Sequence, residues 1–312
     1  MKTPAVQKFI KPGLPLIIVT VLFFLVSWSY NIFFRFEQGS IFNTLIILAC
    51  TILNGFLIAF INKKFAIIRT RTFLPVLIYF LLVTVWKRSF LDIYPHFSLS
   101  IFLLCLIILM GMYKNRNAVV PALWLNLLIS SISLINPIYL LLIPIIYIGI
   151  IHLQSMSLKV FLSSVMGLLI PWIYYLSYQF YMGNEISNIS LLIDEFHPSI
   201  WIYEMLPHEM IYTGLASLIF ILAMFGIYSN LFNDSLQTRK YINLYVFIFV
   251  YLFLLSFLFP STLISILPIF VFLTSILLSH PFTLKHTKFT NYLFLLFCGM
   301  NILYMIYDIL IA

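Results

Sequence analysis

Acidic and histidine side chains gather in one segment of this sequence, between residues 182 and 210, which holds five of the chain's nine Asp and Glu residues. Carboxylates and imidazoles are the side chains that hold divalent cations or transfer protons. The candidates are Asp194, Glu195, His197, Glu204 and His208. Their spacing matches no metal signature, since Tyr212 stands where a zinc-protease pattern beginning at His208 needs its second histidine. We therefore predict no cofactor, with a divalent cation at these residues as the alternative.

Lys87 and Arg88 form a second group of candidate functional residues. These two cations lie together in a short link between apolar runs. They either pair with Asp92 or Glu37 while extending to lipid headgroups, or bind the phosphate of an anionic lipid. The residue types alone leave both interpretations open.

The composition indicates that these side chains are positioned by membrane-spanning segments. Hydrophobic residues make up 63% of the 312 residues and charged residues only 8%, whereas soluble domains carry about 25% charged residues. The net charge of +8 does not indicate a nucleic-acid partner, because the cations are spread between apolar runs. Cys50, Cys105 and Cys298 each lie inside such a run and are interpreted as small buried hydrophobic residues. We predict an all-α, polytopic transmembrane helical bundle.

Crossing the hydrocarbon region takes about 20 apolar residues, and the sequence offers about eleven such spans. One apolar stretch, 118–153, is too long for a single crossing, because a helix of that length would measure about 54 Å. Asn136-Pro137 divides it, and Pro260 divides the similar stretch 241–280. The predicted spans are 14–34, 41–62, 73–86, 97–113, 118–134, 138–153, 160–181, 211–232, two within 241–280, and 291–309.

The distribution of charge orients these spans. With a cytoplasmic N-terminus, all but three of the seventeen Lys and Arg residues fall on the cytoplasmic side, as the positive-inside bias requires. The exceptions are Arg35, Lys87 and Arg88, and Asp234 is the acid that departs from the opposite distribution. We predict that residues 1–312 form a single integral membrane domain with an extracytoplasmic C-terminus, and that 182–210 is an extracytoplasmic loop.

This loop is predicted to contain an interfacial helix. Apolar residues recur in it at near-helical spacing, and aromatic residues that favour the headgroup region follow. The apolar positions are Ile186, Ile189, Ile193 and Phe196, followed by Trp201 and Tyr203. The helix either anchors the loop or makes it a lid over the outer ends of the spans.

Polar side chains inside the predicted spans are mainly Asn54, Asn126 and Asn301. An ion-coupled transporter usually has a titratable group at mid-membrane, and an amide does not titrate. These residues therefore either bond neighbouring helices or line a path for a substrate.

Three features, namely Tyr94-Pro95-His96-Phe97 entering a span, the hairpin at Asn136-Pro137 and the segment from Gly167 to Pro171, resemble an uncharacterised family of bacterial polytopic envelope membrane proteins. The layout is also distantly similar to the membrane half of C-type glycosyltransferases, which use polyprenyl-phosphate sugars at the outer face. This second resemblance implies Glu37 or Asp92 as general base. It also implies Lys87 and Arg88 as ligands of a lipid phosphate.

Together these features predict a protein of a bacterial cytoplasmic (inner) membrane that acts in envelope biogenesis. Three functions stay open: a non-catalytic subunit or scaffold of a membrane complex, a transferase using a lipid-linked sugar, and a carrier for a lipid or small solute. The expected partners are membrane lipids, a polyprenyl-phosphate-linked sugar and other membrane proteins. An enzyme requires the outer acids to converge on a cavity, and a carrier requires a groove among the spans.

Overall fold

A computed structural model describes residues 16–22, 24–25, 28, 41–70, 72–85, 92–183, 207–259, 263–284 and 287–311. Within these ranges every regular element is helical. Seven of the described helices are long and apolar enough to cross a membrane. The predicted all-α class and multi-pass membrane character are therefore confirmed.

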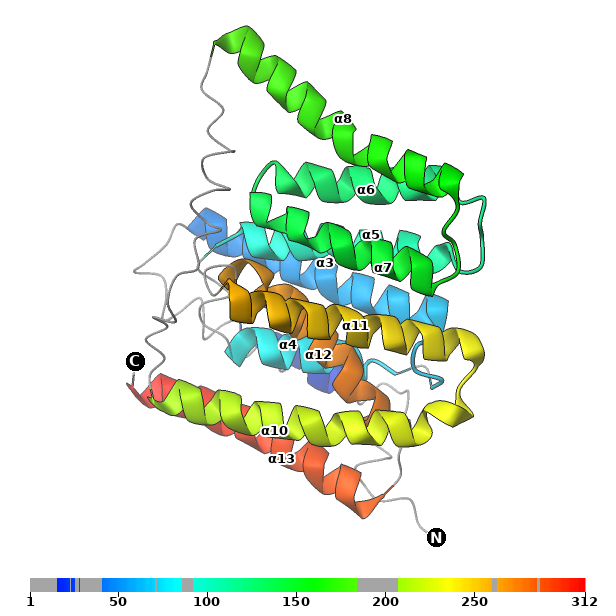
Figure 1. Cartoon of the computed structure of the whole chain (residues 1–312). Coiled ribbons are helices and arrows are strands. Elements are labelled where there is room, and N and C mark those ends of the chain that lie inside the picture. The colour runs from blue at the N-terminus through cyan, green and yellow to red at the C-terminus, as the bar shows by residue number, and fades with distance from the viewer. Residues whose placement is uncertain are drawn as a thin grey trace. The chain divides into compact units, whose positions relative to one another are not determined.

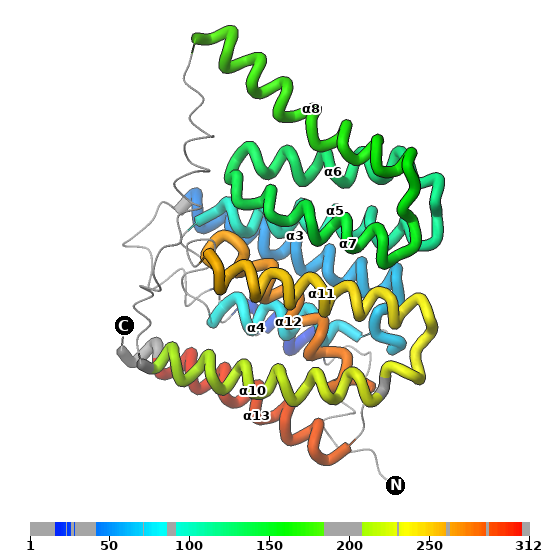
Figure 2. Tube along the Cα trace, in the orientation of Figure 1, coloured from blue at the N-terminus to red at the C-terminus, as the bar shows by residue number. Residues whose placement is uncertain are grey.

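The helices from α3 onward overlap the predicted spans from 41–62 to 291–309, and Figures 1 and 2 show their course. They are α3 (Ile41–Phe65), α4 (Leu74–Val85), α5 (Tyr94–Gly111), α6 (Val119–Ser133), η2 (Pro137–Leu142), α7 (Ile143–His152), α8 (Leu158–Met182), α10 (Pro207–Asn230), η3 (Leu231–Asn233), α11 (Leu236–Leu258), α12 (Leu263–Leu284) and α13 (Lys288–Ile311). Several helices extend beyond their apolar runs: α3 continues through Lys63 and Lys64, and α11 begins before Arg239.

The described chain divides into two compact units. Unit 1 comprises residues 1–93, 203–242 and 268–312, and unit 2 comprises 94–202 and 243–267.

Both predicted proline breaks are confirmed. Around the break predicted at Pro260, which itself lies outside the described residues, α11 ends at Leu258 and α12 begins at Leu263. At the other break, the Asn136 side chain accepts a hydrogen bond from the Ile138 backbone N–H at 3.0 Å. The chain then returns through η2 and α7, so that the Lys114 N–H donates to the Leu153 carbonyl at 3.0 Å. The stretch 118–153 is therefore a hairpin of two short helices.

Both ends of helix α8 are capped, at Ser157 and at Gly183. The Ser157 hydroxyl oxygen accepts a hydrogen bond from the Val160 N–H at 3.3 Å, which satisfies one of the free N–H groups of the first turn. Gly183 ends the helix with φ at +65°, a left-handed conformation that glycine adopts without steric cost.

Small residues let α6 and α8 approach each other closely in unit 2. A Cβ on Gly167 would lie 2.4 Å from the Leu123 carbonyl oxygen, so this position admits glycine alone without a shift of the backbone. The Ser130 hydroxyl of α6 donates to the Leu168 carbonyl of α8 at 2.7 Å. Close backbone approach and side-chain hydrogen bonds are what hold helices together in a bilayer, where the hydrophobic effect between helices is absent.

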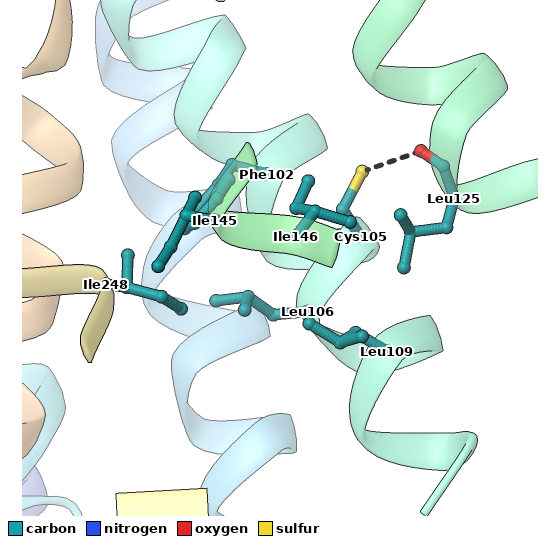
Figure 3. A pocket seen from close by; sticks show the side chains of 8 residues that line it. All are labelled: Phe102, Cys105, Leu106, Leu109, Leu125, Ile145, Ile146 and Ile248. Atoms are coloured by element: carbon teal, nitrogen blue, oxygen red, sulfur yellow. Dashed lines mark hydrogen bonds between the residues drawn. The ribbon is translucent and has the colours of Figure 1, made fainter. Parts of the chain in front are cut away.

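The core of unit 2 encloses a cavity of about 10 Å³ between α5, α6, α7 and α11, shown in Figure 3. A space of this size holds at most one water molecule, and its lining is aliphatic or aromatic except for Cys105. The Cys105 thiol points to the Leu125 carbonyl oxygen at a distance of 3.7 Å, and the side chain is 2% exposed. Cys105 is therefore a small buried residue, as interpreted from the sequence, and this cavity is a packing space.

Candidate functional site

Helices α10 and α13 of unit 1 border a groove of about 720 Å³. Sites for small molecules in proteins commonly measure about 300–1,000 Å³. The groove-lining residues of each helix recur at intervals of three and four, which places them on one helix face. On α10 they are His208, Ile211, Tyr212 and Leu215, and on α13 they are Leu296, Gly299, Met300, Leu303, Tyr304 and Tyr307.

An aromatic cluster occupies one end of this groove. The two helices run antiparallel, so that His208 in the first turn of α10 meets Tyr307 near the end of α13, with 5.3 Å between ring centroids. The His208 and Tyr304 rings lie 6.1 Å apart. Tyr304 is also 4.4 Å from the ring of Tyr212, which brings one imidazole and three phenols to the same end.

A buried hydrogen bond fixes the relative position of the two helices below this cluster. The Tyr212 hydroxyl donates to the Asn301 side-chain oxygen at 2.8 Å, and the Asn301 amide donates to the Phe297 carbonyl at 2.7 Å. Asn301 is 0% exposed and Tyr212 4% exposed. Of the two roles predicted for Asn301, the structure shows the bond to a neighbouring helix.

The remaining wall of the groove is apolar and open. A Cβ on Gly299 would meet no heavy atom within 4 Å, so the absence of a side chain there leaves room for a ligand. Leu303 is 68% exposed and Leu296 57% exposed. At a rise of 1.5 Å per residue, the path from Tyr307 to Leu296 is about 16 Å long, close to half of the roughly 30 Å hydrocarbon thickness. The groove therefore has the length of one leaflet, with aromatic and histidine groups at one end.

Most of the site residues predicted from the sequence lie outside the described residues. These are Glu37, Lys87, Arg88, Asp194, Glu195, His197 and Glu204, together with the predicted interfacial helix. Asp92 is described and lies exposed just before α5. His208 lies in the first turn of α10, because that helix already begins at Pro207. Within the described ranges, no group of three or more His, Cys, Asp and Glu side chains could hold a metal ion.

No protein-family model, curated protein or solved structure matches this chain. The two family resemblances therefore stay predictions, and the chemistry of the groove is what bears on function.

Proposed function

We propose that this chain is a non-catalytic, lipid-binding subunit of a membrane complex that serves envelope biogenesis in a bacterial cytoplasmic membrane. The observation that carries the proposal is the order of polarity along the α10–α13 groove. Its aromatic and histidine end lies at the helix termini, and its aliphatic walls continue along the helices. An amphiphilic lipid has the same order, with a polar head at the interface and an apolar tail below it.

The groups at the polar end suit a phosphate or sugar headgroup. The His208 imidazole donates or accepts hydrogen bonds, and tyrosine hydroxyls do the same. The tail would lie along Leu303 and Leu296, whose exposure allows a lipid to enter sideways from the bilayer. A polyprenyl phosphate or its sugar-linked form, which the sequence resemblance implies as a partner, has both parts.

Filling the groove tests this proposal. Gly299→Phe is expected to lower labelling by a photoactivatable polyprenyl phosphate about tenfold or more, equivalent to about 1.4 kcal/mol of binding free energy, because the ring takes the space beside Leu303. The measurement is crosslinking to the purified protein in proteoliposomes, quantified by mass spectrometry. Gly214→Phe is the matched control, since Gly214 lies on α10 beside the lining residues and its Cβ would also meet nothing within 4 Å. Equal labelling of the Gly299→Phe variant and the unmodified protein would contradict the proposal.

We also propose that the N-terminus is cytoplasmic and the C-terminus extracytoplasmic, as the bias of Lys and Arg supports. In a variant whose native cysteines are replaced, Ser190→Cys is expected to react with a membrane-impermeant maleimide in intact spheroplasts. Asn115→Cys, in the exposed turn after α5, is expected to react only after lysis. The reverse pattern would contradict this topology.

A further inference from the structure

Two arginines of unit 1 converge on a single turn at the C-terminal end of α10, the end opposite His208. Arg69 lies in the segment after α3, and its guanidinium donates to the Asn233 carbonyl at 3.3 Å. Arg239, in the first turn of α11, donates through Nε to the Asp234 carbonyl at 3.0 Å and through a terminal nitrogen to the Phe232 carbonyl. Three consecutive carbonyls therefore hold both guanidinium groups in place.

The acid in this turn, Asp234, has a histidine as its close partner and not the arginines. One oxygen of the Asp234 carboxylate lies 3.1 Å from Nε2 of His280 on α12, and the two side chains are 2% and 1% exposed. Throughout the described part of the chain, neither Arg69 nor Arg239 forms an ion pair with a carboxylate. The Asp234 carboxylate and the C-terminal end of the helix, which contributes about half a negative charge, together offset less than the two guanidinium charges, so the turn stays net positive.

Both guanidinium groups retain donors for a further ligand. Each carries five N–H donors, of which Arg69 uses one and Arg239 two in the bonds above. The fork of an arginine matches the oxygens of a phosphate, and the bonds to backbone carbonyls reduce the entropy lost on binding. The two guanidinium groups therefore present fixed, unused donors of the kind that bind phosphate-type anions.

An exposed aromatic ring beside the cations indicates whether the anion is a free phosphate or the headgroup of a lipid. Phe232 is 81% exposed, and the Arg239 guanidinium carbon lies 5.6 Å from its ring centroid. A free phosphate ion has no apolar part that could pack against this ring, whereas a phospholipid has acyl chains directly below its phosphate. Apolar rings below cationic groups are the arrangement by which proteins engage anionic membrane surfaces.

We propose that Arg69 and Arg239 bind the phosphodiester headgroup of an anionic phospholipid, with Phe232 among its acyl chains, in the leaflet predicted to be cytoplasmic. His280 serves this site by giving the Asp234 carboxylate a partner other than the two cations. The site is separate from the α10–α13 groove and does not depend on the function proposed for it.

Binding of a fluorescent short-chain phosphatidylglycerol to the purified full-length protein in nonionic detergent tests this site. Arg69→Gln and Arg239→Gln are each expected to weaken binding about fivefold and together about 25-fold, from roughly 1 kcal/mol per cation at a membrane surface. Glutamine is shorter than arginine, so its amide nitrogen can replace Nε of Arg239 but does not reach the two carbonyls that the terminal nitrogens contact. The matched control is Lys114→Gln with Arg116→Gln, which removes the same charge from exposed positions and is expected to leave the affinity unchanged.

Each remaining outcome decides for or against the site. Equal weakening by the two double variants would show general charge attraction and overturn the proposal. Inorganic phosphate that displaces the probe at equal concentration would make this a free-phosphate site and overturn the lipid assignment. If the arginine double variant does not elute as a folded protein, Arg69→Gln alone decides, since Arg69 is exposed and makes one of the three bonds. Gly299→Phe is expected to leave this affinity unchanged, which separates the site from the groove.

Discussion

His280→Leu is expected to lower the free energy of unfolding by about 2–3 kcal/mol, because it leaves a buried carboxylate without its hydrogen-bond partner. The Asp234 side chain is 2% exposed and its oxygen lies 3.1 Å from His280. Leucine fills a similar volume but offers no hydrogen bond. Equilibrium unfolding of the purified protein in mixed detergent micelles, followed by tryptophan fluorescence, gives the free energy.

Two companion variants separate the lost partner from a general disturbance of α12. Asp234→Asn keeps an oxygen that accepts from the imidazole, so a loss of only about 1 kcal/mol is expected. Combining His280→Leu with Asp234→Leu removes both polar groups, and this double variant is expected to be more stable than His280→Leu alone. A double variant whose loss equals the sum of two large single losses would refute this account of the pair.

Gly167→Leu is expected to destabilise unit 2 by about 1–3 kcal/mol or more, the cost of overpacking a close contact. The added Cβ would meet the Leu123 carbonyl oxygen at 2.4 Å, and a backbone atom yields less readily than the end of a side chain. The expected result is a lower midpoint of thermal unfolding, measured by size-exclusion chromatography of heated samples.

Gly214→Leu provides the comparison for that variant. Both positions are in long helices, so both gain a similar helix propensity, up to about 1 kcal/mol relative to glycine. Around Gly214 no heavy atom lies within 4 Å of the new Cβ, so its thermal midpoint is expected to stay the same or rise. A parallel fall in both variants would mean that the α6–α8 contact is not what limits stability.

The breaks between helices were predictable from the sequence because they depend on local backbone chemistry. Pro137 lacks an N–H, and Asn136 caps the turn with its own side chain, so the position of this break follows from neighbouring residues. Helix ends were less predictable. α11 begins at Leu236 and includes Arg239 and Lys240, because backbone hydrogen bonds such as that from the Arg239 N–H to the Ser235 carbonyl form before the apolar run begins.

The groove and the arginine turn were not predictable, since each depends on which helices meet. The repeat of His208, Ile211, Tyr212 and Leu215 is visible in the sequence, but it does not show that α13 supplies the other wall. Arg69 and Asn233 are 164 residues apart in the chain. Asp234, the acid that departs from the predicted charge distribution, lies buried against His280, a partner that the sequence does not indicate.

The close contact at Gly167 joins two helices of very different length. Helix α6 has 15 residues and α8 has 25, which at 1.5 Å per residue correspond to about 22 Å and 38 Å. A bilayer with about 30 Å of hydrocarbon matches neither. Val120 and Trp124 of α6 and Tyr174 of α8 are all more than half exposed, so lipids beside the two helices meet apolar walls of unequal height. Such hydrophobic mismatch costs fractions of a kcal/mol per Å, and it makes acyl-chain length, independently of headgroup charge, a determinant of how this protein sits in its membrane.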